Sequence, residues 1–492
     1  MSDAGIRSAS TSSPADLDVL QVAELLRARE LSAVELLNAC LERIAQRNGG
    51  EPTFDGAPDA VNAFVRLYPD VAAKQARAAD KRLAREGADA PLLCGVPVAL
   101  KDLYGAAGLP LTASSRVIAD HVADADAATW ARLRAQGMVL VGHTHTHEFA
   151  AGGTTDQVGN PWALDRTPGG SSGGSAAALA TGMVPAATGT DTCGSLRIPS
   201  AVCGTSSIKP THGRLPLDGI IPLAPSLDHP GPMARTVADC AALLQAMAAG
   251  GPASSPLMPP PAEMGELPLT ARAGGQPFAG LRIALTDRVD STFAKVDPDV
   301  LDGLEAARRA CERLGAEVVE RPAAPDLSGL DLNAIFVAEM ASYHARYAAS
   351  IDLYRPAIRV LLELQSEFES ARTYLDAQRR RAEMTAAWEG WFAEHRVDAL
   401  LEPTVPMPAE PRGAGYGVEH LGGDGDPWIV FTATWDATGF PVAALPAGLG
   451  ARSGLPVGVS LVAPRGREAL VAQLGIDLQA GALPPLGLAP AS

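Results

Sequence analysis

Long apolar runs and paired cysteines are both missing from this sequence. No stretch reaches the roughly 18 uninterrupted apolar residues of a membrane span, and the N-terminal MSDAGIRSASTSSPADL lacks the apolar core of a signal peptide. We therefore expect neither a membrane segment nor a leader. The cysteines show no CxxC spacing, which argues against a disulfide framework or a zinc site and favours reduced thiols in the cytoplasm; they are Cys40, Cys94, Cys193, Cys203, Cys240 and Cys311.

Positive charge is also scarce. The chain has 40 Lys and Arg residues against 56 Asp and Glu, for a formal net charge of −16. This balance argues against nucleic acid or an anionic membrane as the main partner. Lysine is rarer still, at Lys74, Lys81, Lys101, Lys209 and Lys295. Since arginine supplies most of the positive charge, a lysine in an apolar setting is a candidate for chemistry that arginine cannot perform.

What the chain does contain is apolar material for a large core. It has 492 residues, of which 47% are hydrophobic and 20% charged. Ser32 and Glu35 form a capping-box pattern at the start of a helix, and further helices are predicted at 70–86, 125–136, 297–314 and 333–396. Buried strands are predicted within 91–105, where Lys101 and Asp102 end the run, and at 138–142, 281–287, 316–320, 397–406, 440–449 and 455–463. This alternation predicts one large α/β domain.

The densest chemistry lies between Gly169 and Pro199, where two small-residue loops flank a short helix and each presents serines among glycines. Glycine lets the backbone approach a ligand and lets successive N–H groups converge, so Thr192, Cys193, Gly194 and Ser195 are candidate oxyanion donors. A serine nucleophile needs a base, and no Ser-His-Asp arrangement is evident. Buried Lys101 is the alternative, because desolvation favours its neutral amine. Simple turns and phosphate binding remain open at this point, although no GxxxxGK[ST] or GxGxxG motif is present.

Longer motifs carry a family resemblance. They are GVPVALKD (95–102), HEFAAGGTT (147–155), GNPW (159–162), PGGSSGGSAAALATG (168–182), GTDTCGSLRIPSAVCG (189–204), IKPTHGR (208–214), SLDHPGPMARTVAD (226–239), TGFPVAALPAG (438–448) and GLPVGVSLV (454–462). On these motifs the chain resembles the amidase signature family over most of residues 15–480. The resemblance implies the amidase signature fold across 14–485, a single large α/β/α domain with a central mixed β-sheet covered by helices and a core at about 65–245. The composition itself predicts a disordered tail at 1–13 and a surface excursion at 251–277.

The resemblance also implies roles for individual residues. Ser195 resembles the nucleophile, Lys101 the general base, and Ser171 a bridging serine that follows a cis peptide bond, at which Gly170 removes a side-chain clash. The oxyanion donors would be the backbone N–H groups of residues 192–195, with Ser172, Asp191 and Arg197 in support. The implied reaction is acyl transfer to Ser195 and then to water, without a metal or an organic cofactor.

Several positions leave alternatives open. Cys193 stands where the family usually has glycine; either only its backbone N–H is used, or its side chain narrows the acyl pocket or makes activity thiol-sensitive. His143, His145 and His147 alternate as metal ligands on one strand face would, or they are ordinary polar residues. Candidate pocket residues are Phe149, Thr154, Trp428 and Phe431, and the glycine-rich loop 413–428 is a candidate lid.

We therefore expect a cytoplasmic amide hydrolase that acts on a small or aryl amide or anilide, as a monomer or homodimer, with a small molecule as its partner. Carbamates and ureas are alternative substrates of the same chemistry. A second interpretation is the glutaminase A subunit of a tRNA-dependent amidotransferase, although its SSLDQxGP-like segment differs from the SLDHPGP at 226–232. A non-catalytic amidase-like binding protein would need a broken triad, whereas Lys101, Ser171 and Ser195 are all present.

Overall fold

The computed structural model describes residues 13–249, 263–290, 295–326, 330–363, 370–413 and 427–490. Most of the predicted tail, residues 251–262 of the predicted excursion, and most of the candidate lid lie outside these ranges. Ser13 caps a short 3₁₀ helix, Pro14–Asp16, and the described part of the excursion, 263–277, has no helix or strand.

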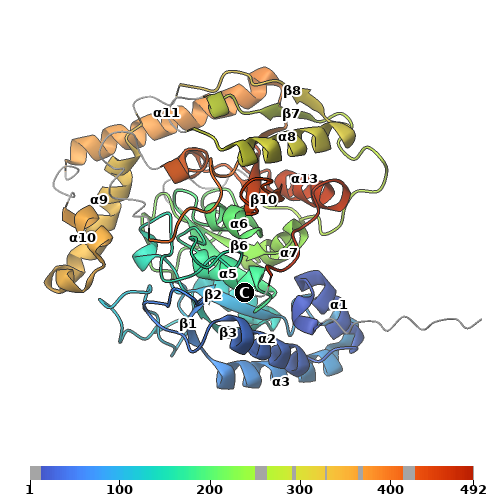
Figure 1. The fold of residues 1–492 in the computed structure, drawn as a ribbon, viewed down its shortest axis with the longest axis vertical. Coiled ribbons are helices and arrows are strands. Elements are labelled where there is room, and N and C mark those ends of the chain that lie inside the picture. The colour runs from blue at the N-terminus through green and yellow to red at the C-terminus, as the bar shows by residue number, and fades with distance from the viewer. Residues whose placement is uncertain are drawn as a thin grey trace, which may run out of the picture.

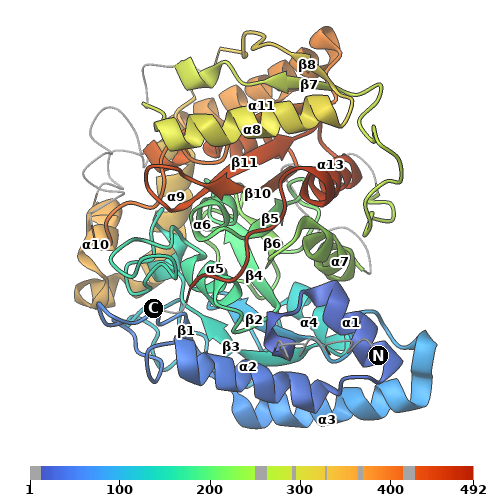
Figure 2. The ribbon, with the colours of Figure 1, turned by 45° about the vertical axis from the view of Figure 1, so that its right-hand side comes forward.

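The central element is one mixed β-sheet, in which the described residues form 11 strands in the order β1-β3-β2-β4-β6-β5-β10-β11-β9-β7-β8. Figure 2 shows this order from β1 and β3 at the bottom to β7 and β8 at the top. The strands are β1 (Phe64–Leu67), β2 (Pro97–Lys101), β3 (Val139–Thr144), β4 (Ala186–Asp191), β5 (Ser206–Lys209), β6 (His229–Ala234), β7 (Arg282–Leu285), β8 (Glu317–Val319), β9 (Ala399–Pro403), β10 (Val442–Leu449) and β11 (Pro456–Val462).

The pairing explains why the sheet is mixed. β2 runs parallel to both β3 and β4, and β7 runs parallel to both β8 and β9. The strands between these two parallel groups pair antiparallel, from β4 through β6, β5, β10 and β11 to β9. The prediction of a single α/β/α domain around a mixed sheet is confirmed.

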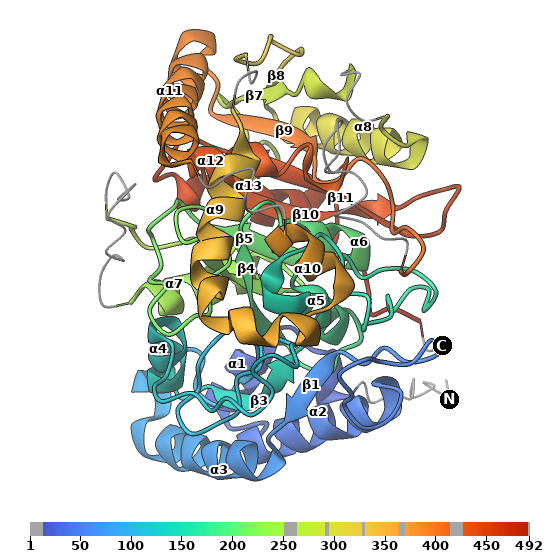
Figure 3. The same ribbon diagram turned by 90° about the vertical axis from the view of Figure 1, so that its left-hand side faces the viewer.

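Helices cover the sheet on both sides (Figures 1 and 3). They are α1 (Val19–Ala28), α2 (Ala33–Arg47), α3 (Pro69–Glu86), α4 (Ala128–Gln136), α5 (Gly173–Ala180), α6 (Arg197–Cys203), α7 (Val237–Ala248), α8 (Pro298–Arg313), α9 (Leu332–His344), α10 (Pro356–Glu363), α11 (Ala371–His395), α12 (Ala433–Thr438) and α13 (Glu468–Gly481). The predicted capping box is present, since Ser32 and Glu35 bond each other's backbone N–H at the start of α2.

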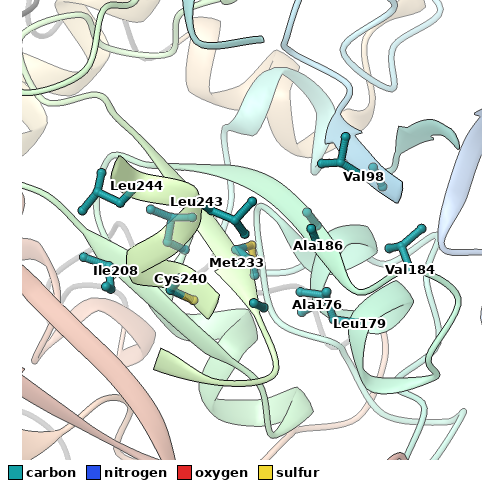
Figure 4. Packing of buried hydrophobic residues seen from close by; sticks show 14 of the residues in the cluster. Val98, Ala176, Leu179, Val184, Ala186, Ile208, Met233, Cys240, Leu243 and Leu244 are labelled. Atoms are coloured by element: carbon teal, nitrogen blue, oxygen red, sulfur yellow. The ribbon is translucent and has the colours of Figure 1, made fainter. Parts of the chain in front are cut away.

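The core lies where small side chains let helices approach the central strands. Ala176 and Leu179 of α5 and Cys240 and Leu243 of α7 belong to the same buried cluster, which also takes in Val98, Ala186, Ile208 and Met233 from β2, β4, β5 and β6 (Figure 4). α5 is alanine-rich and fully buried, so its backbone packs close to β2 and β4. This packing fixes the loop that precedes α5 against the ends of those strands.

Candidate active site

Two parallel strands bring the predicted base and the predicted nucleophile loop to one edge of the sheet. Lys101 is the last residue of β2 and Asp191 the last residue of β4, and these neighbouring strands run parallel. Ser171 lies just before α5, and Ser195 lies between β4 and α6. In an α/β sheet, ligands bind beyond the carboxyl ends of the strands, where these loops meet.

Lys101 is fully buried and contacts two hydroxyl groups. Its Nζ lies 2.7 Å from Ser171 Oγ and 2.8 Å from Thr190 Oγ1. Burial lowers the pKa of Lys101 to about 7, although the carboxylates of Asp191 and Asp228 act in the opposite direction. A neutral amine beside a serine hydroxyl is the arrangement that general-base chemistry requires.

The peptide bond between Gly170 and Ser171 is cis. The Ser171 carbonyl accepts hydrogen bonds from His147 N–H, at 3.0 Å, and from Thr155 Oγ1, at 3.2 Å. A side chain at Gly170 would lie 2.5 Å from the carbonyl oxygen of Thr154, so this position requires glycine. The predicted residues Gly170, Ser171 and Thr154 are thus brought together, with Thr154 contacting the loop through its backbone.

Ser195 is 7% exposed, and its carbonyl accepts the Ser172 N–H at 3.3 Å. The Ser172 hydroxyl lies 3.3 Å from the carbonyl oxygen of Thr190. Ser172 therefore connects the loop before α5 to strand β4 and to the loop that carries Ser195. The supporting role that the resemblance implies for Ser172 stays a prediction.

Asp191 organises the backbone on both sides of Ser195. Its Oδ1 accepts the Gly194 N–H at 2.5 Å, and its Oδ2 accepts the Leu196 N–H at 3.2 Å. Arg197 holds Asp191 in turn, with Nε 2.8 Å from Oδ2 and Nη2 2.9 Å from Oδ1. The Gly194 N–H, one of the four predicted oxyanion donors, thus already has an acceptor, and the N–H groups of residues 192, 193 and 195 stay predicted donors.

Cys193 does not have the left-handed backbone that would make glycine necessary there. The positive φ of this loop falls at Gly194, at 135°. A cysteine therefore fits the backbone without strain. The alternative, that its partly exposed thiol shapes the acyl pocket, stays a prediction.

The three alternating histidines point to different partners. His143 contacts Tyr68 Oη and the Tyr104 carbonyl, and His145 contacts the Thr53 carbonyl. His147 contacts the Glu148 carbonyl. Burial lowers the pKa of His145 to about 3 and of His147 to about 4. In the part of the chain that the structure describes, no three His, Cys, Asp or Glu side chains are grouped to hold a metal ion.

The predicted pocket aromatics lie in three different buried places. Phe149 packs edge-to-face with His344, with ring centroids 4.5 Å apart, and is near Tyr343, Tyr347 and Tyr354. Trp428 packs beside α6, in a cluster with Ile198 and Val202. Phe431 packs with Val296, Val300 and Val457. Phe149 is the one nearest to Ser171 along the chain, and contact of all three with substrate stays a prediction.

Two site residues were not foreseen from the sequence. Thr190 is the second hydroxyl partner of Lys101, and Asp228 accepts the Thr192 hydroxyl at 2.6 Å. Burial raises the pKa of Asp228 to about 6. Both residues lie inside quoted motifs, 189–204 and 226–239, and Thr188 and Thr190 alternate along β4 with a period of two; these were the available signals.

Comparison with known proteins shows to which family this chain belongs. The family model described as Amidase matches residues 53–472. A protein named "Amidase" from Pseudomonas putida is 40% identical over 88% of this chain and 89% of its own length. The A subunit of a glutamyl-tRNA(Gln) amidotransferase from Cupriavidus pinatubonensis is 36% identical over 90% of this chain and 92% of its own length.

Solved structures of amidase-type hydrolases have the same fold as this chain. 6-Aminohexanoate cyclic dimer hydrolase in complex with its substrate superimposes with a TM-score of 0.81 at 28% identity, covering 96% of this chain and 98% of that one. A bacterial aryl acylamidase has the same fold, with a TM-score of 0.76 at 24% identity over 94% of this chain and 96% of that one.

The chain belongs to the amidase signature family. It is therefore a hydrolase of carbon–nitrogen bonds, and a serine–serine–lysine mechanism is general to this family. Among the described residues, the helices are all too short or too polar to cross a membrane.

Proposed function

We propose that this protein hydrolyses a small or aryl amide through an acyl-enzyme on Ser195, with Ser171 and Lys101 as the proton relay. The observation that carries the proposal is the 2.7 Å contact between Lys101 Nζ and Ser171 Oγ. The lowered pKa of Lys101, caused by burial, supports a neutral amine near neutral pH.

The proposed steps use this chain's residues alone. Lys101 accepts the Ser171 proton while Ser171 accepts the Ser195 proton, and Ser195 Oγ then bonds to the carbonyl carbon of the amide. The backbone N–H groups of residues 192, 193 and 195 stabilise the oxyanion of the tetrahedral intermediate. The relay returns the proton to the leaving amine as the C–N bond breaks. A water molecule then repeats the cycle on the acyl-enzyme and releases the acid.

The aryl preference rests on the aromatic residues around Phe149. Phe149 follows His147 by two residues, and the His147 N–H bonds the Ser171 carbonyl. Tyr343, Tyr347 and Tyr354 surround Phe149, at 5.8 to 6.5 Å between ring centroids. We infer that these rings line the acyl pocket, where they would favour a flat, apolar substituent on the amide.

The experiment is a substrate panel with Ser195→Ala. We expect the wild type to cleave anilides and small aliphatic amides, and Ser195→Ala to lose at least about 10³-fold in kcat/KM. Ser200→Ala is the matched control, because the Ser200 hydroxyl donates to the Leu196 carbonyl within α6, and it should keep wild-type activity. Ser195→Ala with wild-type activity would refute the mechanism. Faster cleavage of carbamates or ureas than of anilides would refute the substrate class and leave the mechanism in place.

The relatives named as the A subunit of an amidotransferase favour a second candidate, a glutaminase that works in a complex. Activity of the isolated chain separates the two. Turnover of simple amides by the purified chain alone supports the amidase. Glutamine hydrolysis that requires added partner proteins supports the second candidate.

We also propose a cytoplasmic location, which the six free cysteines support.

A further inference from the structure

Residues 432–436, at and within α12, contact the chain on both sides of Ser195, at Cys193 and at Arg197. The Thr432 hydroxyl donates to the Cys193 carbonyl, with an O–O distance of 2.5 Å. Asp436 Oδ2 lies 2.5 Å from Arg197 Nη2. Both side chains are buried, and their partners lie 239 positions away along the chain in each case.

The contact through Asp436 reaches the backbone beside Ser195 in two steps. Arg197 binds Asp436 through Nη2, and it binds both carboxylate oxygens of Asp191 through Nε and Nη2. Asp191 in turn accepts the N–H groups of Gly194 and Leu196, which flank Ser195. Asp436 therefore restrains Arg197, and through it the carboxylate that sets this backbone.

The contact through Thr432 is a close steric fit. A Cβ atom added to Gly194 would lie 2.5 Å from Thr432 Oγ1 and 2.8 Å from Thr432 Cβ. The Thr432 carbonyl also accepts from Arg197 Nη1 at 3.0 Å. Thr432 thus leaves room only for glycine at position 194, and its hydroxyl binds the carbonyl of the preceding residue.

The region around residues 432–436 is in turn bound to residues at strands β7 and β9, at the other end of the sheet from β2. Arg288, which follows β7, donates to the Thr434 hydroxyl at 3.0 Å and to the Val430 carbonyl at 3.3 Å. Arg288 also pairs with Glu402 of β9, which accepts the Trp435 indole N–H as well. α12 further packs against α11 (Figure 3). The Ser195 loop is therefore held by elements that contain none of the proposed relay residues.

We propose that Thr432 and Asp436 are positioning residues, which hold the backbone donors beside Ser195 where the oxyanion forms. This inference rests on the proposed acyl transfer at Ser195. Each oxyanion donor is worth about 10²–10³-fold in kcat when it is correctly placed. A small displacement of this loop therefore lowers kcat and leaves ground-state binding nearly unchanged.

The test compares Thr432→Val with Thr438→Val. Thr438 is also buried in α12, and its hydroxyl donates within the helix to the Thr434 carbonyl. We measure kcat, KM and the inhibition constant of phenylboronic acid, which forms a tetrahedral adduct with the serine. We expect Thr432→Val to lower kcat by about 10- to 100-fold and to raise the inhibition constant of the boronic acid by a similar factor. KM should stay within about threefold of the wild-type value. Thr438→Val should match the wild type.

A second pair of variants tests Asp436. Asp436→Ala should lower kcat as Thr432→Val does, and Asp436→Asn, which keeps a hydrogen-bond acceptor for Arg197, should recover most of it. Glu468→Gln is the control for loss of a buried ion pair, since Glu468 lies 2.8 Å from Arg214. This variant should lower the stability of the protein without changing kcat. If Thr432→Val does not fold, the comparison of Asp436→Ala with Asp436→Asn tests the positioning role.

The outcomes separate this inference from the proposed function. If Ser195→Ala is inactive while Thr432→Val and Asp436→Ala keep wild-type kcat, the positioning role is wrong and the mechanism stands. If KM rises and kcat stays constant, the segment binds substrate instead, and the inference is also wrong. If Ser195→Ala remains active, the proposed function itself fails.

Discussion

The ends of strands β2 and β5 each carry a fully buried lysine, and their surroundings differ in one respect. Burial lowers the pKa of Lys101 and of Lys209 to about 7. Lys101 contacts two hydroxyl groups, those of Ser171 and Thr190. Lys209 donates to two backbone carbonyls, Phe440 at 2.6 Å and Pro210 at 3.3 Å.

The difference lies in what the partners can do with a proton. A hydroxyl group both donates and accepts, so a proton can pass between Ser171 and Lys101 in either direction. A carbonyl oxygen only accepts, so Lys209 has a fixed role as donor. A shifted pKa is therefore not enough to identify a catalytic base, because desolvation lowers the pKa of both lysines.

The largest effect is expected at Lys101. Lys101→Met keeps the length of the side chain and removes the proton acceptor, and we expect kcat/KM to fall by about 10³–10⁴-fold. Lys101→Arg should be equally inactive, since a guanidinium stays protonated at the assay pH. Steady-state kinetics on an anilide measure both, and a loss below tenfold in Lys101→Met would contradict the role of base.

The pH dependence of kcat/KM distinguishes the two lysines. Only the neutral Lys101 accepts a proton, so activity should rise by about one log unit per pH unit below the pKa and level off above it. Because burial lowers the pKa of Lys101 to about 7, the midpoint should lie near that pH, well below the ordinary lysine value. Lys209→Met should keep the same midpoint. If the midpoint disappears in Lys209→Met, the titrating group is Lys209 at the end of β5 and not Lys101.

The sequence predicted the secondary structure correctly where the local pattern and the place of the segment in the fold agree. Strand β2 and its terminal lysine, the capping box of α2, and the helix after the serine–glycine loop were all predicted. Strands β4 and β6 were not. Their sequences, AATGTD and HPGPMA, are rich in small residues or proline, which have little strand propensity, and their pairing with neighbouring strands determines their conformation.

Some residues of the active site could also be predicted from the sequence, and others could not. Lys101, Ser171 and Ser195 stand in motifs that a reader of the sequence can find. The roles of Thr190 and Asp436 could not be predicted from a local motif, because they come from contacts with residues 89 and 239 positions away. Such pairings depend on the order of strands in the sheet, which no local pattern contains.

Thr190 offers a smaller test of the same comparison. Thr190→Val removes one hydroxyl partner of Lys101 and leaves Ser171 in place, so we expect kcat to fall by about 5- to 20-fold with little change in KM. Thr188→Val is the control on the same strand, because the Thr188 hydroxyl accepts the backbone N–H of Lys101 and not its amine. Equal losses in both variants would show that the effect comes from strand β4 as a whole.

The smallest effect on turnover is expected at Lys209, where stability should change instead. Lys209→Met leaves the carbonyls of Phe440 and Pro210 without this donor, and an unsatisfied buried acceptor costs about 1–3 kcal/mol. We expect a lower Tm in thermal unfolding, whereas kcat per folded molecule, titrated by phosphonylation of the serine, should stay within about fivefold of the wild type. This outcome would separate the two buried lysines into one that moves a proton and one that holds strand β5 to the segment before β10. A loss comparable to that of Lys101→Met would instead place Lys209 in the reaction and remove the distinction between hydroxyl and carbonyl partners.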